Sequence, residues 1–167
     1  MNADAFRHFY AYHFAENRKI WAYAMQLSEA QFTQAVDYSH GSVRDQIVHL
    51  IQCEAIWFSE LRGVEFIEPI LAADERGSLR TYWDGVEQHI QRYLGELRDE
   101  MLFDKPIKEP EEDKELIVWQ VLLHVVNHAT DHRAQLLRLF NDLGIKTSSQ
   151  DYIFYVYDNP IDASHIQ

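Results

Sequence analysis

The chain has 167 residues, of which 47% are hydrophobic and 13% aromatic, a length and composition typical of one globular domain. We therefore expect a single domain over residues 1–167. The 15 basic and 27 acidic residues give a net charge of −12, which argues against nucleic acid or an anionic membrane surface as a partner.

The N-terminal residues show neither the basic start nor the apolar stretch of a secretory signal. No apolar run approaches the ~20 residues that a membrane-spanning helix requires. The single cysteine, Cys53, cannot form an internal disulfide, which is typical of proteins in a reducing compartment. We therefore expect a cytoplasmic protein without a membrane segment.

The first apolar-periodic segment predicts a helix that begins near Asp4 and ends near Ser28. His13 and Asn17 fall within its apolar stripe, so both side chains are expected to face the core. The other members of the stripe are Phe6, Phe9, Tyr10, Phe14, Ile20, Trp21, Ala24 and Leu27.

The second predicted helix begins at Ser42, where the hydroxyl and the Asp45 side chain can form a capping pair. It ends near Gly63, because glycine readily adopts the left-handed conformation that follows a helix. Glu54 lies near the centre of its apolar stripe, where an unpaired carboxylate is costly to bury. We interpret Glu54 as a paired group, with Asn17 among the candidate partners, and keep proton transfer as the alternative.

The third predicted helix begins after Ser78 and ends before Pro106, and its apolar residues show the alternating three- and four-residue spacing of a bundle seam. A charged, proline-containing connection is expected over residues 105–113.

The fourth helix is predicted from about Lys114 to Leu143, with Gly144 as its stop. Ser148 and Asp151 are expected to cap a short final helix that is rich in aromatic residues. Four long helices and one short one favour an all-α fold, namely an antiparallel four-helix bundle with an extra C-terminal helix.

Nine histidines exceed ordinary usage, and three of them, His124, His128 and His132, are spaced four residues apart in the fourth helix. Imidazoles at this spacing project from one side of a helix, and two of them can converge on one metal ion. The apolar periodicity places His128 and His132 at the flank of the core, where a pocket between helices can form, and predicts that His124 is either exposed or part of the polar surroundings of the ion.

A catalytic metal ion usually takes three protein ligands, so a third donor is needed from another helix. Composition and spacing leave four candidates open: His13, His49, Cys53 and His89.

Residues 123–135, with the sequence LHVVNHATDHRAQ, resemble the fourth-helix signature of the DinB, or DinB/YfiT-like, family. Residues 41–50, GSVRDQIVHL, resemble its second-helix signature together with the following Glu54 and Trp57. The two segments occur in the same order as in the family.

The likeness continues with residues 9–18 near the start and residues 144–153 near the end, and so covers nearly the whole chain. The resemblance implies that one divalent metal ion, such as zinc, nickel or iron, is held by His49, His128 and His132. It therefore favours His49 as the third donor. It also implies a homodimer.

Two positions depart from the family pattern. Asp131 stands where many relatives have an aromatic residue or a histidine, and Ala134 stands where many have a glycine. Neither is a ligand position. Asp131, together with His13, Asn17 and Glu54, is a candidate for the polar surroundings of the ion.

Three neutral imidazoles leave a bound dication its full charge, which can acidify a water or a thiol. The resemblance implies the same two uses: metal-dependent hydrolysis, and transfer of low-molecular-weight thiols to electrophiles during stress. Our first hypothesis is a metal-dependent enzyme of this kind that acts on a small-molecule substrate. The alternatives are a non-catalytic metal-holding or stress-response bundle that acts through a dimer or partner surface, and a bundle that binds no metal.

Overall fold

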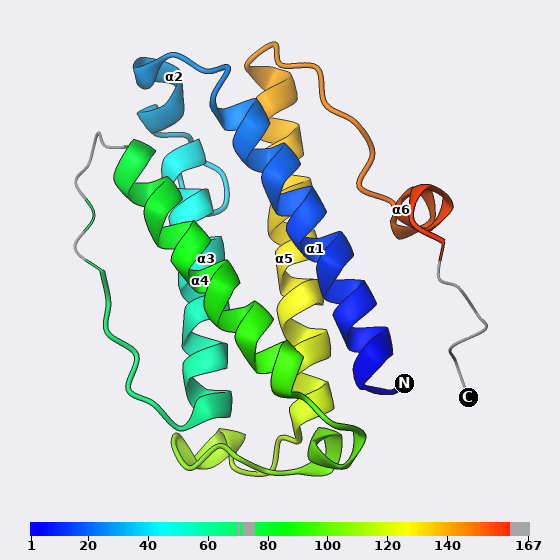
Figure 1. Ribbon diagram of the computed structural model, residues 1–167. Coiled ribbons are helices and arrows are strands. Elements are labelled where there is room, and N and C mark those ends of the chain that lie inside the picture. The colour runs from blue at the N-terminus through cyan, green and yellow to red at the C-terminus, as the bar shows by residue number, and fades with distance from the viewer. Residues whose placement is uncertain (70, 72–75, 161–167) are drawn as a thin grey trace.

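The computed structural model describes residues 1–69, 71 and 76–160, and this part of the chain contains helices and no strand. The predicted all-α bundle is confirmed. Its long helices are α1 (Ala3–Ala24), α3 (Val43–Arg62), α4 (Arg76–Glu96) and α5 (Val118–Asp142) (Figure 1). The connections hold α2 (Glu29–Thr33), the 3-10 turns η1 (Asp99–Phe103) and η2 (Glu111–Asp113), and the C-terminal helix α6 (Tyr152–Asp158).

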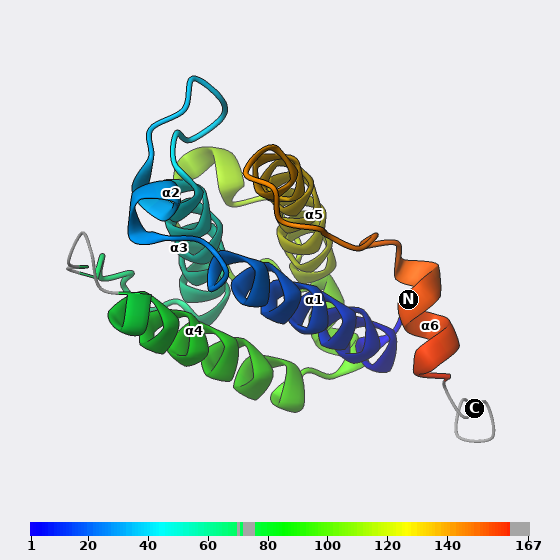
Figure 2. The ribbon, with the colours of Figure 1, turned by 90° about the horizontal axis from the view of Figure 1, so that it is seen from above.

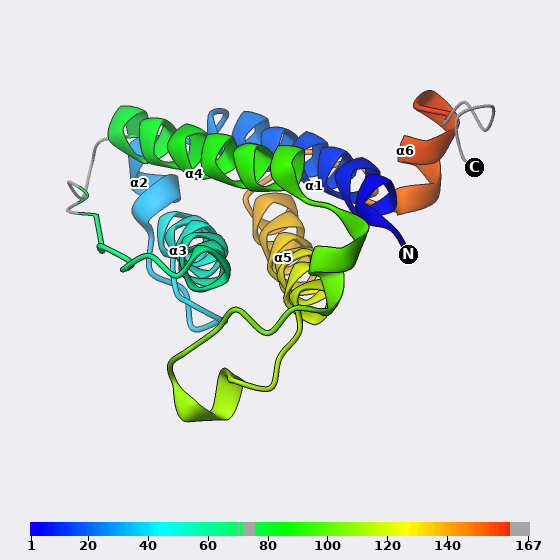
Figure 3. The same cartoon turned by 60° about the horizontal axis from the view of Figure 1, so that its bottom comes forward.

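The four long helices form two layers, with α1 and α4 in one and α3 and α5 in the other (Figure 3). Each helix of one layer contacts both its layer partner and one helix of the other layer. α1 and α5 run in one direction and α3 and α4 in the other, because the chain returns to the starting end of α3 before α4 begins (Figure 1). The antiparallel pairs are therefore α1 with α4 and α3 with α5.

The first helix is shorter than predicted, because Ser28 starts a new helix instead of ending the first. The Gln31 N–H donates to the Ser28 hydroxyl at 3.2 Å, and the Ser28 N–H donates to the Gln31 side chain at 3.0 Å. This reciprocal capping box defines the start of α2. The predicted stripe is otherwise buried or partly buried in the core.

The second predicted helix is confirmed at both ends. The Asp45 N–H donates to the Ser42 hydroxyl at 3.1 Å, and that hydroxyl donates to the Asp45 carboxylate at 2.7 Å. Gly63 ends α3 with a φ of +62°, in the left-handed region where a side chain would be strained. The Ser42 cap fixes where α3 begins, and with it the position of His49 along the bundle.

The third helix ends before Pro106, as predicted, but already at Glu96, and it begins at Arg76, just before Ser78. Arg7 of α1 explains the early end, since its guanidinium donates to the carbonyl of Leu94 at 2.9 Å and also binds the carbonyl of Leu97. These interactions satisfy carbonyls that a longer helix would have used itself.

α5 begins at Val118 rather than near Lys114, because the Gln120 side chain accepts the Ile117 N–H at 3.0 Å and so closes the start of the helix. Its end agrees with the prediction to within a residue, and Gly144 follows with a φ of +83°.

The predicted short helix is confirmed as α6, although neither Ser148 nor the Asp151 side chain caps it. The Ser148 N–H donates to the Tyr23 hydroxyl at 3.0 Å, and the Asp151 N–H donates to the Ser149 hydroxyl at 3.1 Å. α6 lies outside the bundle, beyond α1 (Figure 2). Rings of α6 pack against His8, Phe9 and Tyr12 of α1.

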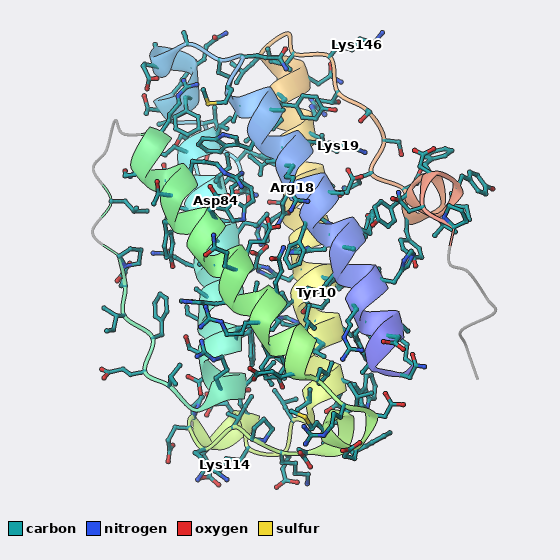
Figure 4. The ribbon with its side chains drawn as sticks, viewed as in Figure 1. Tyr10, Arg18, Lys19, Asp84, Lys114 and Lys146 are labelled. Atoms are coloured by element: carbon teal, nitrogen blue, oxygen red, sulfur yellow. The ribbon has the colours of Figure 1, made fainter. Side chains whose placement is uncertain are left out.

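The interior of the bundle is mostly apolar, and its large side chains also tie helices together. Tyr10, labelled in Figure 4, points from α1 into the bundle, and its hydroxyl donates to the Leu122 carbonyl of α5 at 3.0 Å. Across the described residues, none of the helices is both long and apolar enough to cross a membrane.

Candidate metal centre

The three histidines predicted as ligands lie together between α3 and α5, which pack side by side (Figures 1 and 3). The ring centroid of His49 on α3 lies 5.3 Å from that of His128 and 4.6 Å from that of His132. The two α5 rings are 4.3 Å apart. His132 is buried, whereas His49 and His128 are half-buried, so the cluster is open to solvent on one side.

A fourth histidine, His40, joins the cluster from the loop that precedes α3. Its ring stacks on that of His49 with centroids 3.6 Å apart and an angle of 15° between the planes, and it lies 5.2 Å from the ring of His132. His40 is not among the predicted donors, because a loop residue has no apolar periodicity from which its direction can be predicted.

The ligand atoms come closest together in two sets of three. One set is His40, His49 and His132, and the other is His49, Cys53 and His128; within each set the atoms lie within 4.8 Å of one another. The three predicted ligands are divided between these sets: His132 belongs to the first, His128 to the second, and His49 to both. Imidazole nitrogens with a nearby thiol are donors that suit zinc, nickel or iron, so the residues present fit such an ion.

The three predicted ligands, His49, His128 and His132, are electrically neutral near pH 7. Burial, followed by the neighbouring imidazoles, lowers the pKa of His49 to about 4, and burial with the adjacent histidines lowers the pKa of His128 to about 4. Burial and then His40 also lower the pKa of His132. The ring nitrogens therefore carry the free electron pairs that a metal ion needs.

A chain of hydrogen bonds determines which nitrogen of His132 carries its proton. The His40 N–H donates to the Gln46 side-chain oxygen at 3.1 Å, and the Gln135 amide nitrogen donates to the Asp131 carboxylate at 3.0 Å. A backbone N–H can only donate and a carboxylate can only accept, so both amides are fixed in orientation. The Gln46 nitrogen donates to the Gln135 oxygen at 2.6 Å and to Nδ1 of His132 at 3.0 Å. Neutral His132 therefore carries its proton on Nε2.

Three of the predicted surrounding residues, His13, Asn17 and Glu54, belong to a buried polar network with Arg133. Nε2 of His13 lies 3.0 Å from the Glu54 carboxylate, and Asn17 donates to the same oxygen at 3.1 Å. Arg133 donates to the Asn17 side-chain oxygen and to Nδ1 of His13, both at 3.0 Å. Glu54 is thus paired, as the first interpretation expected, and Asn17 is one of its partners.

Both ring nitrogens of His13 are engaged in this network, so it is not free to bind an ion. Burial lowers the pKa of His13 and outweighs the opposing effect of Glu54. The ring therefore stays neutral between the carboxylate and the Arg133 guanidinium. The charge of Glu54 also acts, as a minor contribution, to raise the pKa of His128. The charge of Glu54 in the network therefore acts on the histidine cluster.

The remaining histidine candidates lie outside the cluster or at its edge. His89 is exposed on α4, beside a cavity of about 230 Å³ between α3 and α4. His124 is exposed, as predicted; its ring lies 5.7 Å from that of His128 and 5.1 Å from that of Trp57.

Comparison of the sequence with curated proteins gives no match. The family model of the DinB family matches residues 1–163, which is nearly the whole chain and includes both helices of the histidine cluster. The chain therefore belongs to the DinB family.

Proposed function

We propose that the protein is a metal-dependent enzyme in which His49, His128 and His132 hold one divalent ion and leave a coordination position open. The observation that carries the proposal is the contact of these three neutral rings between two facing helices. Three protein ligands with one open position are typical of catalytic rather than structural sites.

When bound, such an ion would lower the pKa of a water or a thiol at the open position toward neutrality. The residues of the chain would position the reactants and the ligands. Gln46 orients the ring of His132, and Asp131 fixes Gln135 at the outer end of the same chain of hydrogen bonds. Two reaction classes follow from this chemistry, namely hydrolysis and transfer of a low-molecular-weight thiol to an electrophile.

Elemental analysis of protein purified without a histidine tag tests the site directly. We expect about one zinc, nickel or iron per chain after loading. His128→Ala should abolish tight binding, whereas the matched variant His124→Ala, which removes an exposed histidine one turn away, should keep it. Equal loss of binding in both variants, or no binding by the wild type, would contradict the proposed ligands.

The two reaction classes are separated by their substrates. The loaded protein is offered an activated ester for hydrolysis, and a small thiol with an activated aryl chloride for thiol transfer. In the second reaction a sulfur–carbon bond forms, chloride leaves, and the thiol proton passes to the solvent. Turnover that requires the ion in either assay identifies the class, whereas metal binding without turnover of any substrate would favour a metal-holding role.

That non-catalytic role is supported by one observation, the two extra donors His40 and Cys53 beside the predicted ligands. A site whose positions are all filled by protein is closed and typical of structural or storage metal. Binding of a small anion or thiol to the loaded protein, followed by spectroscopy, distinguishes an open site from a closed one.

The proposal also includes a cytoplasmic location, a role under stress, and a homodimer that binds no nucleic acid. The exposed apolar residues of α6, Ile153, Phe154 and Tyr157, support a surface for a second copy. The net charge of −12 supports the absence of nucleic-acid binding. Analytical ultracentrifugation tests the dimer. Retention on a DNA column at physiological salt would contradict the expectation that the protein binds no nucleic acid.

A further inference from the structure

The loop over residues 34–42 has an unusual backbone at the point where it presents His40. Ser39 has a φ of +52°, in the left-handed region that is uncommon for residues with a side chain, and Gly41 has a φ of +90°. The Gly41 N–H closes this turn by donating to the Tyr38 carbonyl at 3.1 Å. A strained residue inside a tight turn often marks a functional position.

Two further hydrogen bonds hold the turn against the bundle beside the histidine cluster. The Ser39 hydroxyl binds the Gln135 side-chain oxygen of α5, and the His40 N–H binds the Gln46 side chain of α3. The loop is therefore tied to both helices that carry the predicted ligands. The result is that the His40 ring lies over that of His49.

Although the backbone of His40 is held, its ring lies on the solvent side of the cluster. The residue is exposed, unlike the buried His132 and the half-buried His49. A cavity of about 550 Å³ separates other residues of the loop, among them Val36 and Tyr38, from the end of α5. The hydrogen bonds that hold the turn involve the backbone of His40 and the Ser39 hydroxyl, so the His40 ring can leave that of His49 by rotation of its own side chain without breaking them.

We propose that His40 is a displaceable fourth ligand, which binds the ion when the site is empty of substrate and swings out when another anionic ligand, or a thiol that has lost its proton to the solvent, takes its place. This inference rests on the proposed metal site and adds a residue that controls access to it. Its support is that His40 completes a close set with His49 and His132, from a loop rather than from a helix.

Cys53 is the other extra donor, but it is a poor candidate for this role. It lies within α3, one turn after His49, and its Sγ is 3.6 Å from Nε2 of His49. A donor fixed on a packed helix cannot leave the ion without moving the helix. His40 is therefore the donor whose departure can open the site.

Cobalt(II) is a suitable probe, because its visible absorption reports the number and type of its ligands. The wild type, His40→Ala and the matched control His124→Ala are loaded with Co²⁺, and affinity is measured by competition with a chelator. We expect His40→Ala to weaken binding on the order of tenfold and to change the spectrum, while His124→Ala changes neither. Free imidazole should restore the wild-type spectrum and affinity of His40→Ala.

Rescue by imidazole separates a ligand from a merely structural residue, since a disturbed loop would not be repaired by a free ring. A small thiol added to the wild type should replace one nitrogen donor, as seen by a sulfur-to-cobalt absorption band. An unchanged His40→Ala spectrum and affinity, or weakened binding without rescue, would overturn the role of His40 while leaving the metal site intact. Absence of Co²⁺ and Zn²⁺ binding by the wild type would instead overturn the proposed function, and this inference with it.

Discussion

The Gln46 amide nitrogen lies 3.0 Å from Nδ1 of His132 and donates a hydrogen bond to it. A neutral imidazole has one proton and one free electron pair. An ion on Nε2 would require the proton to move to Nδ1, where it would face the amide nitrogen, and an ion on Nδ1 would displace that nitrogen. In both cases the hydrogen bond must change when the ion binds.

Gln46→Glu is therefore expected to tighten metal binding. A carboxylate can accept a hydrogen bond from a proton on Nδ1 of His132, which leaves Nε2 free for the ion, and it can still accept a hydrogen bond from the His40 backbone N–H. We expect a gain in Zn²⁺ affinity on the order of tenfold, measured by competition with a chelator. The control Gln46→Met keeps the size but offers His132 neither a donor nor an acceptor, so it should bind less tightly than Gln46→Glu. Equal affinities for the two variants would refute this account of Gln46.

The metal-free protein should lose stability as the pH falls from about 6.5 to about 4. In the unfolded chain His49 and His128 take up protons near their ordinary pKa of 6.5, whereas in the folded protein they do so only near 4. Unfolding therefore takes up protons in this window, which lowers the free energy of unfolding as the pH falls. Urea midpoints measured across the window test this, and the variant His49→Gln/His128→Gln should show a shallower dependence on pH.

Metal binding near pH 7 should release few protons from the histidines, since His49 and His128 are already neutral. Cys53 is different, because burial and then Glu54 raise the pKa of its thiol, so that it must lose a proton to act as a ligand. Calorimetry in two buffers of different ionisation enthalpy counts the released protons. Release that disappears in Cys53→Ala would show that the thiol binds the ion, and release that persists would come from a bound water.

The buried network predicts a strong coupling between Arg133 and Glu54. Arg133→Met removes the only positive charge among the four residues of the network and leaves the Glu54 carboxylate buried, which should cost about 3–5 kcal/mol of folding free energy. Glu54→Gln keeps the side-chain oxygen that His13 and Asn17 bind and should cost less. The double variant should be more stable than the sum of the two losses predicts, as measured by urea unfolding. Strict additivity would argue against the coupling.

Much of the fold was predictable, because the signals for helix ends are local. Ser42 with Asp45, Gly63 and Gly144 act within one turn of chain, and the structure has these ends where the residues indicate them. The end of α4 was not predictable, since it depends on Arg7 from another helix. The end of α1 was within reach, because Ser28 and Gln31 form a recognisable capping box that the apolar periodicity obscured.

The candidate site was predictable only in part. Helical spacing suffices to bring His128 and His132 to one side of α5, but the direction of His40 depends on a loop turn with positive φ at Ser39, which no periodic pattern encodes. The position of His13 illustrates a second limit. Its place in the apolar stripe correctly indicates burial, yet only the contacts with Glu54 and Arg133 show that its ring nitrogens are already engaged.

The contact between Gln46 and His132 joins residues 86 positions apart in the chain. Between them lie all of α4 and both 3-10 turns. During synthesis α3 can therefore pack against α5 only after α5, the last of the long helices, has been made. No neighbouring pair of helices in the sequence brings His49 together with the α5 histidines. An ion held across α3 and α5 would therefore be acquired last, and metal content would distinguish chains that have finished folding from those that have not.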